Sequence, residues 1–276
     1  MHRFRTADIL SAIILVLAAA ASAGGLLLAG LYRDNDLVRS AWLGNDLVTL
    51  VVAVPVLAAS LACARRGSPR ARLVQLGMLD YMLYNYAFYL FGAAFNSLFL
   101  LYAALFTLAI FALISGLLDL DVGLIAGRIR PRASFRWVSG WMVFVALGLT
   151  AVYLIQSLQF IATAALPAIV VATGHPTSVV FALDLSLVVP VLLLGAVWLW
   201  QRRPWGYVLA AVVNVKGAVY MLALSGATAA SFQFGFLEDP SQIVLWLVLG
   251  AGSLLAVLRL LRNLDAIQPR SPGIRG

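Results

Sequence analysis

Three charged residues lie inside long apolar stretches of the sequence, where a charge needs a partner. Lys216 is the only lysine of the chain, and Asp80 and Asp184 fall in two other apolar stretches. A cation at the centre of a bilayer costs about 2.5–3.5 kcal/mol by insertion scales. We therefore expect Lys216 to face the protein interior and to pair with Asp80 or Asp184. The pair would act as a coupling or binding charge, or as an ion pair that fixes helix packing.

The stretch that holds Asp80 is the most polar of the apolar stretches. On a helical wheel at about 100° per residue, five polar side chains share one half of the helix. Such a stripe predicts a face turned toward a helix bundle or a cavity. The side chains could bind a ligand through hydroxyl and amide groups, or join helices through hydrogen bonds worth only about 0.6 kcal/mol each. The five are Asp80, Tyr81, Tyr84, Asn85 and Tyr89.

Other polar residues have simpler interpretations. Asp46 follows Gly44 and Asn45 at the start of an apolar stretch, and we interpret it as a helix N-terminal cap. Cys63 is the single cysteine, so it cannot form an intrachain disulfide, and we expect a buried structural thiol.

Several function classes lack their sequence signatures. The two histidines, His2 and His175, lie outside the apolar stretches, so we expect no haem and no histidine-ligated metal site. No P-loop, nucleophile elbow or Gly-rich nucleotide motif occurs. No stretch is long enough for a soluble domain that could hydrolyse ATP. The sequence names no cofactor and leaves enzymatic activity undecided.

The composition identifies the solvent of the chain as lipid. Of 276 residues, 63% are hydrophobic and 11% are charged, whereas soluble domains carry about 25% charged residues. The mean hydropathy of +0.99 agrees. The net charge of +8 would favour nucleic-acid binding in a soluble protein, but here arginines in the loops on one side of a membrane explain it, and we expect no nucleic-acid partner.

The apolar stretches predict an all-α integral membrane protein with about eight transmembrane helices in a bundle. A span needs about 20 mostly apolar residues, and a helix satisfies its own backbone hydrogen bonds in lipid. The predicted spans are Ile9–Leu31, Leu43–Ala64, Leu73–Gly92, Leu98–Leu118, Trp137–Ser157, Val179–Trp200, Tyr207–Ala227 and Gln242–Leu261.

The arginines predict the orientation of these spans. With eight spans, 16 of the arginines fall on one side, and only Arg33 and Arg39 fall on the other. The positive-inside rule then places both termini in the cytoplasm, in the inner membrane of the cell. The 16 are Arg3, Arg5, Arg65, Arg66, Arg70, Arg72, Arg128, Arg130, Arg132, Arg136, Arg202, Arg203, Arg259, Arg262, Arg270 and Arg275.

Two segments leave alternatives open. Basic residues, an apolar run and Ala21-Ser22-Ala23 resemble a secretory signal, so residues 1–23 are either a cleaved signal or part of the first span. The apolar segment Leu158–Ser178 on the outer side is either an interfacial helix or a re-entrant hairpin.

The two halves of the sequence share an order of features that predicts an internal duplication. Asp46, Pro55 and a double arginine followed by proline reappear as Asp184, Pro190 and a second double arginine followed by proline. The match pairs residues 1–136 with residues 137–276, four spans each, so the halves would form a parallel repeat with a site between them.

These observations favour a protein that binds or transports a small solute, a proton or an apolar ligand. The polar centre would be built from Asp80, Tyr84, Asn85, Asp184 and Lys216, with the bilayer as a partner and a small molecule or lipid as ligand. The alternatives are a membrane-embedded enzyme acting on a lipid or isoprenoid substrate, and a structural or assembly subunit. The sequence does not choose an oligomeric state.

Overall fold

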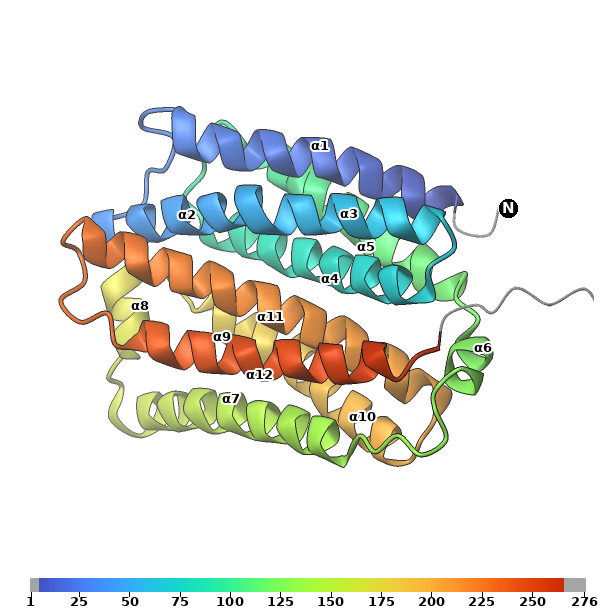
Figure 1. Cartoon of the computed structure of the whole chain (residues 1–276). Coiled ribbons are helices and arrows are strands. Elements are labelled where there is room, and N and C mark those ends of the chain that lie inside the picture. The colour runs from blue at the N-terminus through green and yellow to red at the C-terminus, as the bar shows by residue number, and fades with distance from the viewer. Residues whose placement is uncertain (1–4, 266–276) are drawn as a thin grey trace, which may run out of the picture.

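A computed structural model describes residues 5–265 of the chain, and these form a bundle of helices joined by short loops (Figure 1). Within this range there is no β-strand, and Ile129 and Leu264 make one isolated bridge. The α-helices are α1 (Arg5–Leu27), α2 (Asp36–Val48), α3 (Val54–Arg65), α4 (Pro69–Gly92), α5 (Phe99–Leu118), α6 (Val122–Gly127), α7 (Arg136–Thr163), α8 (Ala168–Thr173), α9 (Val179–Leu183), α10 (Val189–Trp200), α11 (Pro204–Gln233) and α12 (Gln242–Arg262).

Seven long helices of the described chain are apolar enough to cross a membrane. They are α1, α5, α7, α11, α12 and two composite helices, Asp36–Arg65 and Val179–Trp200. The chain is therefore a multi-pass helical membrane protein, as its composition predicts. The 24-residue helix α4 is not among the seven, because its polar residues lower its hydropathy.

The two composite helices owe their shape to a proline. Each contains a π-helical segment, η1 (Thr49–Ala53) or η2 (Asp184–Val188), that runs directly into the sequence Val-Pro-Val-Leu. Proline has no N–H and its ring clashes with the carbonyl group four residues earlier. The residue before each proline bonds five residues back instead, Val54 to Thr49 and Val189 to Asp184. Both helices are thus widened at the same distance before the proline.

Helix α11 occupies the centre of the bundle. In its most apolar part 67% of the residues are buried, against 28–33% in the other six apolar helices. It packs against α2, α4, α10 and α12 (Figure 1). Small residues permit two of these contacts: a Cβ on Gly44 would clash with the backbone of Gly226, and one on Gly77 would clash with Val215. The backbones of α2 and α4 therefore lie directly on α11.

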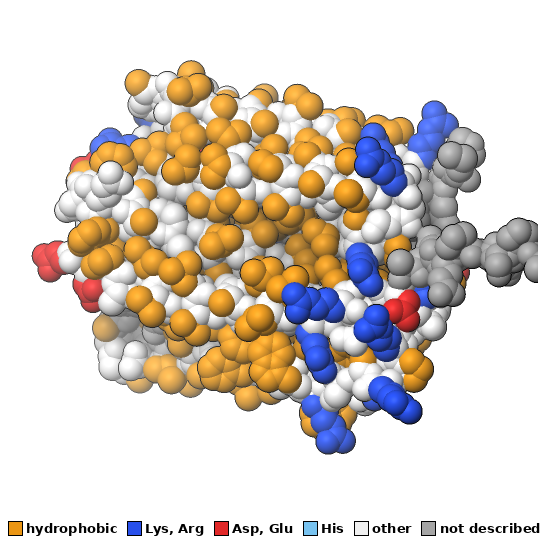
Figure 2. Space-filling view, in the orientation of Figure 1, with side chains coloured by type: hydrophobic (Ala, Val, Ile, Leu, Met, Phe, Trp, Pro, Cys, Tyr) orange, Lys and Arg blue, Asp and Glu red, His pale blue; other side chains and the backbone are white. Residues whose placement is uncertain are grey.

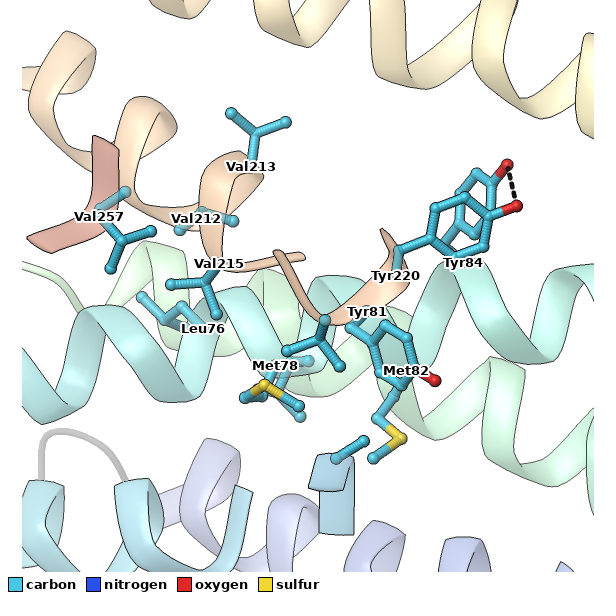
Figure 3. Close-up of a cluster of buried hydrophobic side chains, with 14 of the residues drawn as sticks. Leu76, Met78, Tyr81, Met82, Tyr84, Val212, Val213, Val215, Tyr220 and Val257 are labelled. Carbon is cyan, nitrogen blue, oxygen red and sulfur yellow. Dashed lines mark hydrogen bonds between the residues drawn. The ribbon is translucent and has the colours of Figure 1, made fainter. Parts of the chain in front are cut away.

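Helix α4 is the other central helix, and it packs against α3, α5 and α11. Its buried side chains surround its axis, because Tyr86 and Ala87 are buried as well as the polar stripe. Figure 3 shows Leu76 of α4 beside Val212 and Val215 of α11, with Met78 and Met82 farther along α4.

The helix ends refine the predicted span limits. The composite helix Val179–Trp200 has the predicted bounds. The other composite helix, Asp36–Arg65, begins at Asp36 and not at Leu43. Helix α7 extends to Thr163, and its C-cap residue Ala164 has a left-handed backbone (φ 56°). The segment Leu158–Ser178 is thus the end of α7 followed by the six-residue helix α8.

Charged side chains divide between the two ends of the bundle. Figure 2 shows most of the visible Lys and Arg side chains at the end where α1 begins and α12 ends. We call this the arginine-rich end; the opposite end carries Glu238 and Asp239 in the loop between α11 and α12. Arg3, Arg270 and Arg275 lie outside the described residues. The prediction for Cys63 was wrong, because α3 turns this thiol outward, where it is exposed.

Candidate functional site: two polar clusters joined by helix α4

The first cluster lies at the centre of the bundle around the carboxylate of Asp184. This residue is the first of η2 and is 4% exposed. Tyr84 of α4 donates a hydrogen bond to Oδ1 at 2.8 Å, and Tyr153 of α7 donates one to Oδ2 at 2.6 Å. The hydroxyl groups of Tyr84 and Tyr220 lie 3.5 Å apart (Figure 3). Three helices and η2 thus meet at one carboxylate.

Lys216 of α11 belongs to the same cluster, where its ammonium group contacts aromatic rings and not a carboxylate. Its Nζ lies 3.7 Å from the ring centroid of Tyr84 and 5.3 Å from that of Tyr220. A desolvated ammonium group on an aromatic face gains about 2 kcal/mol. Among the described residues, no carboxylate oxygen forms an ion pair with Lys216 within 4.0 Å, although Asp184 and Asp80 are both near enough to interact with its charge.

Asp80 lies one helical turn before Tyr84 and faces the same cluster. Its only neighbouring opposite charge in the described chain is Lys216. Its side chain keeps some accessible surface although it lies deep among protein atoms. The central cluster, defined as Asp80, Tyr84, Tyr153, Asp184, Lys216 and Tyr220, therefore holds two carboxyl groups and one amine.

The second cluster lies nearer the end opposite to the arginines, around Asp46 of α2. Asp46 is 3% exposed, and it accepts hydrogen bonds from Tyr32 and from Tyr89, the latter at 2.8 Å. Asn45 donates to the Tyr89 hydroxyl and to Asn85 Oδ1, both at 2.9 Å. We call Tyr32, Asn45, Asp46, Asn85 and Tyr89 the Asp46 cluster.

The prediction that Asp46 caps a helix was wrong. Helix α2 begins ten residues earlier, at Asp36, and its N-cap is Asn35, whose side chain accepts a hydrogen bond from the Val38 N–H at 3.0 Å. Asp46 therefore lies inside the helix and turns its carboxylate into the bundle.

The predicted stripe on α4 divides between these two clusters. Asp80 and Tyr84 face the central cluster, whereas Asn85 and Tyr89 belong to the Asp46 cluster. Tyr81 lies between them, 2.8 Å from the Thr49 hydroxyl at the start of η1. Helix α4 thus carries a continuous polar stripe from the central cluster around Asp184 to the cluster around Asp46.

Four participants were missed by sequence reasoning: Tyr32, Asn45, Tyr153 and Tyr220. Tyr220 is four residues after Lys216, so the spacing that places side chains on one helix face could have indicated it. Tyr153 stands alone in an apolar run, and Tyr32 lies just before the charged loop that begins at Arg33. Only the tertiary packing brings them to Asp184 and Asp46.

A third polar network closes the arginine-rich end. The Arg72 guanidinium forms an ion pair with Asp8 and donates to Gln75 Oε1 at 2.6 Å. Gln75 donates in turn to the Ser11 hydroxyl at 2.9 Å. These side chains fix α1 against α4. In the described chain no group of three or more His, Cys, Asp or Glu side chains is placed to hold a metal ion.

The fold and these clusters define a class, a multi-pass α-helical membrane protein with buried carboxyl groups on two levels of its bundle. Comparison with known proteins adds no narrower identity, since no family model, no curated protein and no solved structure matches the chain.

Proposed function

We propose that the chain is a membrane transporter that binds a proton and a small solute at the central cluster. The observation that carries this proposal is the charge balance of the cluster. Asp80, Asp184 and Lys216 hold one negative charge in excess when all three are ionised. An uncompensated charge in a low-dielectric interior is costly. One bound proton makes the cluster neutral, and so does a monovalent cation.

The position of Lys216 supports exchange at this site. Its ammonium group lies on the face of Tyr84 and is not locked to either carboxylate. A small movement of the lysine side chain toward Asp80 or Asp184 would leave the other carboxylate free to take a proton. Proton uptake and lysine position are then linked, as coupling to a solute requires.

The proposed topology has eight spans with both termini in the cytoplasm. Helix α4 is long enough to cross a bilayer, and its polar residues are covered by α3, α5 and α11. If α4 is counted as a span, the chain crosses the bilayer eight times and its arginine-rich loops all lie on one side. The positive-inside rule assigns that side to the cytoplasm, in the inner membrane. Cysteines at Ser68 and Ser97, in a Cys63→Ser background, should then label from opposite sides with an impermeant maleimide.

The proposed transporter consists of two parallel repeats, residues 1–136 and 137–276. Support comes from η1 and η2, which both precede Val-Pro-Val-Leu, and from Pro69 and Pro204, which follow at equal spacing and begin α4 and α11. This alignment pairs Asp184 with Thr49, the first residues of η2 and η1, and not with Asp46 as the sequence features suggested. Gly77 and Val212 are equivalent in it, and they face each other where α4 crosses α11. Equivalent residues meet in this way on a twofold axis, and the central cluster lies beside it.

A pH jump on proteoliposomes attached to a solid-supported membrane tests the proposal without knowledge of the solute. The wild type should give a transient charge displacement, and Asp184→Asn or Asp80→Asn should reduce it several-fold. The exposed residue Asp36 gives the matched control, Asp36→Asn, which should behave as the wild type. A wild-type signal equal to that of empty liposomes would overturn proton binding.

Salt exchange at constant pH separates the two ways of neutralising the cluster. Replacing choline chloride by sodium chloride should give no displacement if the cluster takes a proton. A sodium-dependent displacement that Asp184→Asn removes would instead assign the cluster to an alkali cation.

A further inference from the structure

The Asp46 cluster contains a buried carboxyl group without any positive partner. In the described chain its side-chain contacts are the hydroxyl groups of Tyr32 and Tyr89, and no Lys, Arg or His side chain interacts with it. Lys216 does not serve as this partner, because Asp80 and Asp184 are the carboxylates of the described chain with which its charge interacts. Hydrogen bonds from two hydroxyls offset part of the desolvation cost of a carboxylate, but they leave its charge uncompensated.

Three buried polar atoms near this cluster lack hydrogen-bond partners: Asn85 Nδ2, the Tyr102 hydroxyl and the Ser22 hydroxyl. All three residues are at most 2% exposed. They come from α4, α5 and α1, which surround the cluster. The Tyr102 ring lies 5.0 Å from that of Tyr89. Buried polar atoms are normally satisfied by protein or by ordered water, so this arrangement is suited to bound water.

The Tyr102 hydroxyl occupies a particular place between the cluster and the surface. It lies close to the Tyr32 hydroxyl on one side and to the Asn96 side chain on the other, although it forms no hydrogen bond of good geometry with either. Asn96 in turn lines a hollow of about 490 Å³ at the end of the bundle opposite to the arginines. Tyr32, Tyr102 and one or two waters would thus join Asp46 to this hollow.

Helix α1 leaves the space that this arrangement needs. Gly25 packs against Asp46 and the Tyr32 hydroxyl, and a Cβ at this position would clash with both. The neighbouring hollow is lined by Arg33, whose charge disfavours the approach of a metal cation. A proton can move from the hollow into the bundle along hydroxyls and water, so no whole ion has to travel from the hollow to Asp46.

We propose that Asp46 is a second proton-binding site, which exchanges protons with the hollow through Tyr32, Tyr102 and bound water. Uptake begins with a hydronium ion in the hollow, which gives up its proton and becomes water. Each hydroxyl along the chain accepts a proton on one side and releases one on the other. The last transfer forms the O–H bond of the Asp46 carboxylic acid. This inference rests on the contacts of Asp46 and not on the proposed transport function.

Infrared spectroscopy of the purified protein tests the proposal directly. The carboxylic acid C=O band should contain a component that Asp46→Asn removes and that Asp184→Asn leaves unchanged. Tyr32→Phe should shift this component, because it deletes one hydrogen bond to the carboxyl group. The Tyr32→Phe shift keeps the assignment testable if Asp46→Asn does not fold. Loss of a component in Asp184→Asn alone would support the central cluster and overturn this proposal.

Exchange into D₂O tests the route. The Asp46 band should move within the mixing time in the wild type and several-fold more slowly in Tyr102→Phe. Tyr153→Phe is the matched control, since Tyr153 touches Asp184 and not Asp46, and it should exchange as the wild type does. Equal exchange in Tyr102→Phe and the wild type would exclude the route. A sodium-dependent gain in thermal stability that Asp46→Asn abolishes would replace the proton by an alkali cation.

Discussion

Lys216 Nζ and the ring of Tyr84 lie 3.7 Å apart, and the hydroxyl of the same tyrosine donates to Asp184. Tyr84 therefore contacts the Lys216 ammonium group through its ring face and the Asp184 carboxylate through its hydroxyl group. This geometry keeps the two charges close without a direct ion pair. It also makes the two contacts of Tyr84 separable by mutation.

Tyr84→Phe should keep the cation–π contact and lose the hydrogen bond to Asp184. Tyr84→Leu should lose both contacts, so it should destabilise the protein further, by about 2 kcal/mol for the desolvated cation–π contact. Thermal unfolding in detergent measures this difference. Equal stability of the two variants would show that the ring face does not hold Lys216. The pH-jump displacement should fall in Tyr84→Phe already, because Asp184 loses a donor.

Gly44→Ala should be among the most destabilising small substitutions in the chain. A methyl group there clashes with the backbone of Gly226, so α2 has to move away from α11. Overpacking of this kind costs about 1–3 kcal/mol. Gly148 in α7 is the matched control, since nothing lies within 4 Å of a Cβ there and Gly148→Ala should be neutral or stabilising. Similar melting temperatures for both variants would contradict the close α2–α11 contact.

Asp8→Asn should lower stability more than Asp265→Asn, although both delete one carboxylate of an ion pair with arginine. The Asp8 and Arg72 side chains are 14% and 7% exposed, whereas those of Asp265 and Arg130 are 56% and 59% exposed. Removing one partner of a buried pair costs about 3–5 kcal/mol, and an exposed pair contributes about 0–1 kcal/mol. Chemical denaturation of both variants provides the comparison. Equal losses of unfolding free energy in the two variants would show that the Asp8–Arg72 pair contributes no more than an exposed ion pair.

Sequence patterns predicted the helices well, and they pointed to some of the polar side chains that the bundle brings together. Long apolar runs reveal helices in lipid because each run must satisfy its own backbone, and Val179–Trp200 was predicted to the residue. The start of α2 was missed because its first turns are polar, so the beginning of the apolar run was mistaken for the beginning of the helix. That error hid the position of Asp46 inside the helix and within the bundle.

The π segments and the tyrosine partners could not be predicted from a single sequence. A shift from four-residue to five-residue hydrogen bonding leaves no mark in an apolar run such as Leu50-Val51-Val52. Tyr153 reaches Asp184 only because α7 packs beside α10. Lys216, in contrast, was expected to form an ion pair, and the preference of its ammonium group for Tyr84 depends on ring positions that only the folded bundle defines.

Alkaline pH should destabilise the protein through Tyr32. Burial and the nearby Asp46 carboxylate raise the pKa of Tyr32 above its ordinary value of 10.0. The protonated hydroxyl is therefore favoured by folding, and its contribution is complete below pH 10 and is lost as pH rises above that value. Thermal stability should fall more steeply above pH 10 in the wild type than in Tyr32→Phe. Parallel pH profiles would show that Tyr32 titrates normally.

Pro190→Ala should disconnect Asp184 from its tyrosines while leaving the helix intact. An alanine N–H restores the four-residue hydrogen bond, so η2 can relax into an α-helix and turn Asp184 by about 100° relative to α10. The hydrogen bonds from Tyr84 and Tyr153 would then be lost.

Circular dichroism of Pro190→Ala should match the wild type, and its pH-jump displacement should fall to that of Asp184→Asn. Pro55→Ala is the matched variant, because it relaxes η1 and turns Thr49 away from Tyr81 but leaves Asp184 in place. It should retain the displacement from the central cluster. A full displacement in Pro190→Ala would mean that packing against α4 and α7, and not the π segment, orients Asp184.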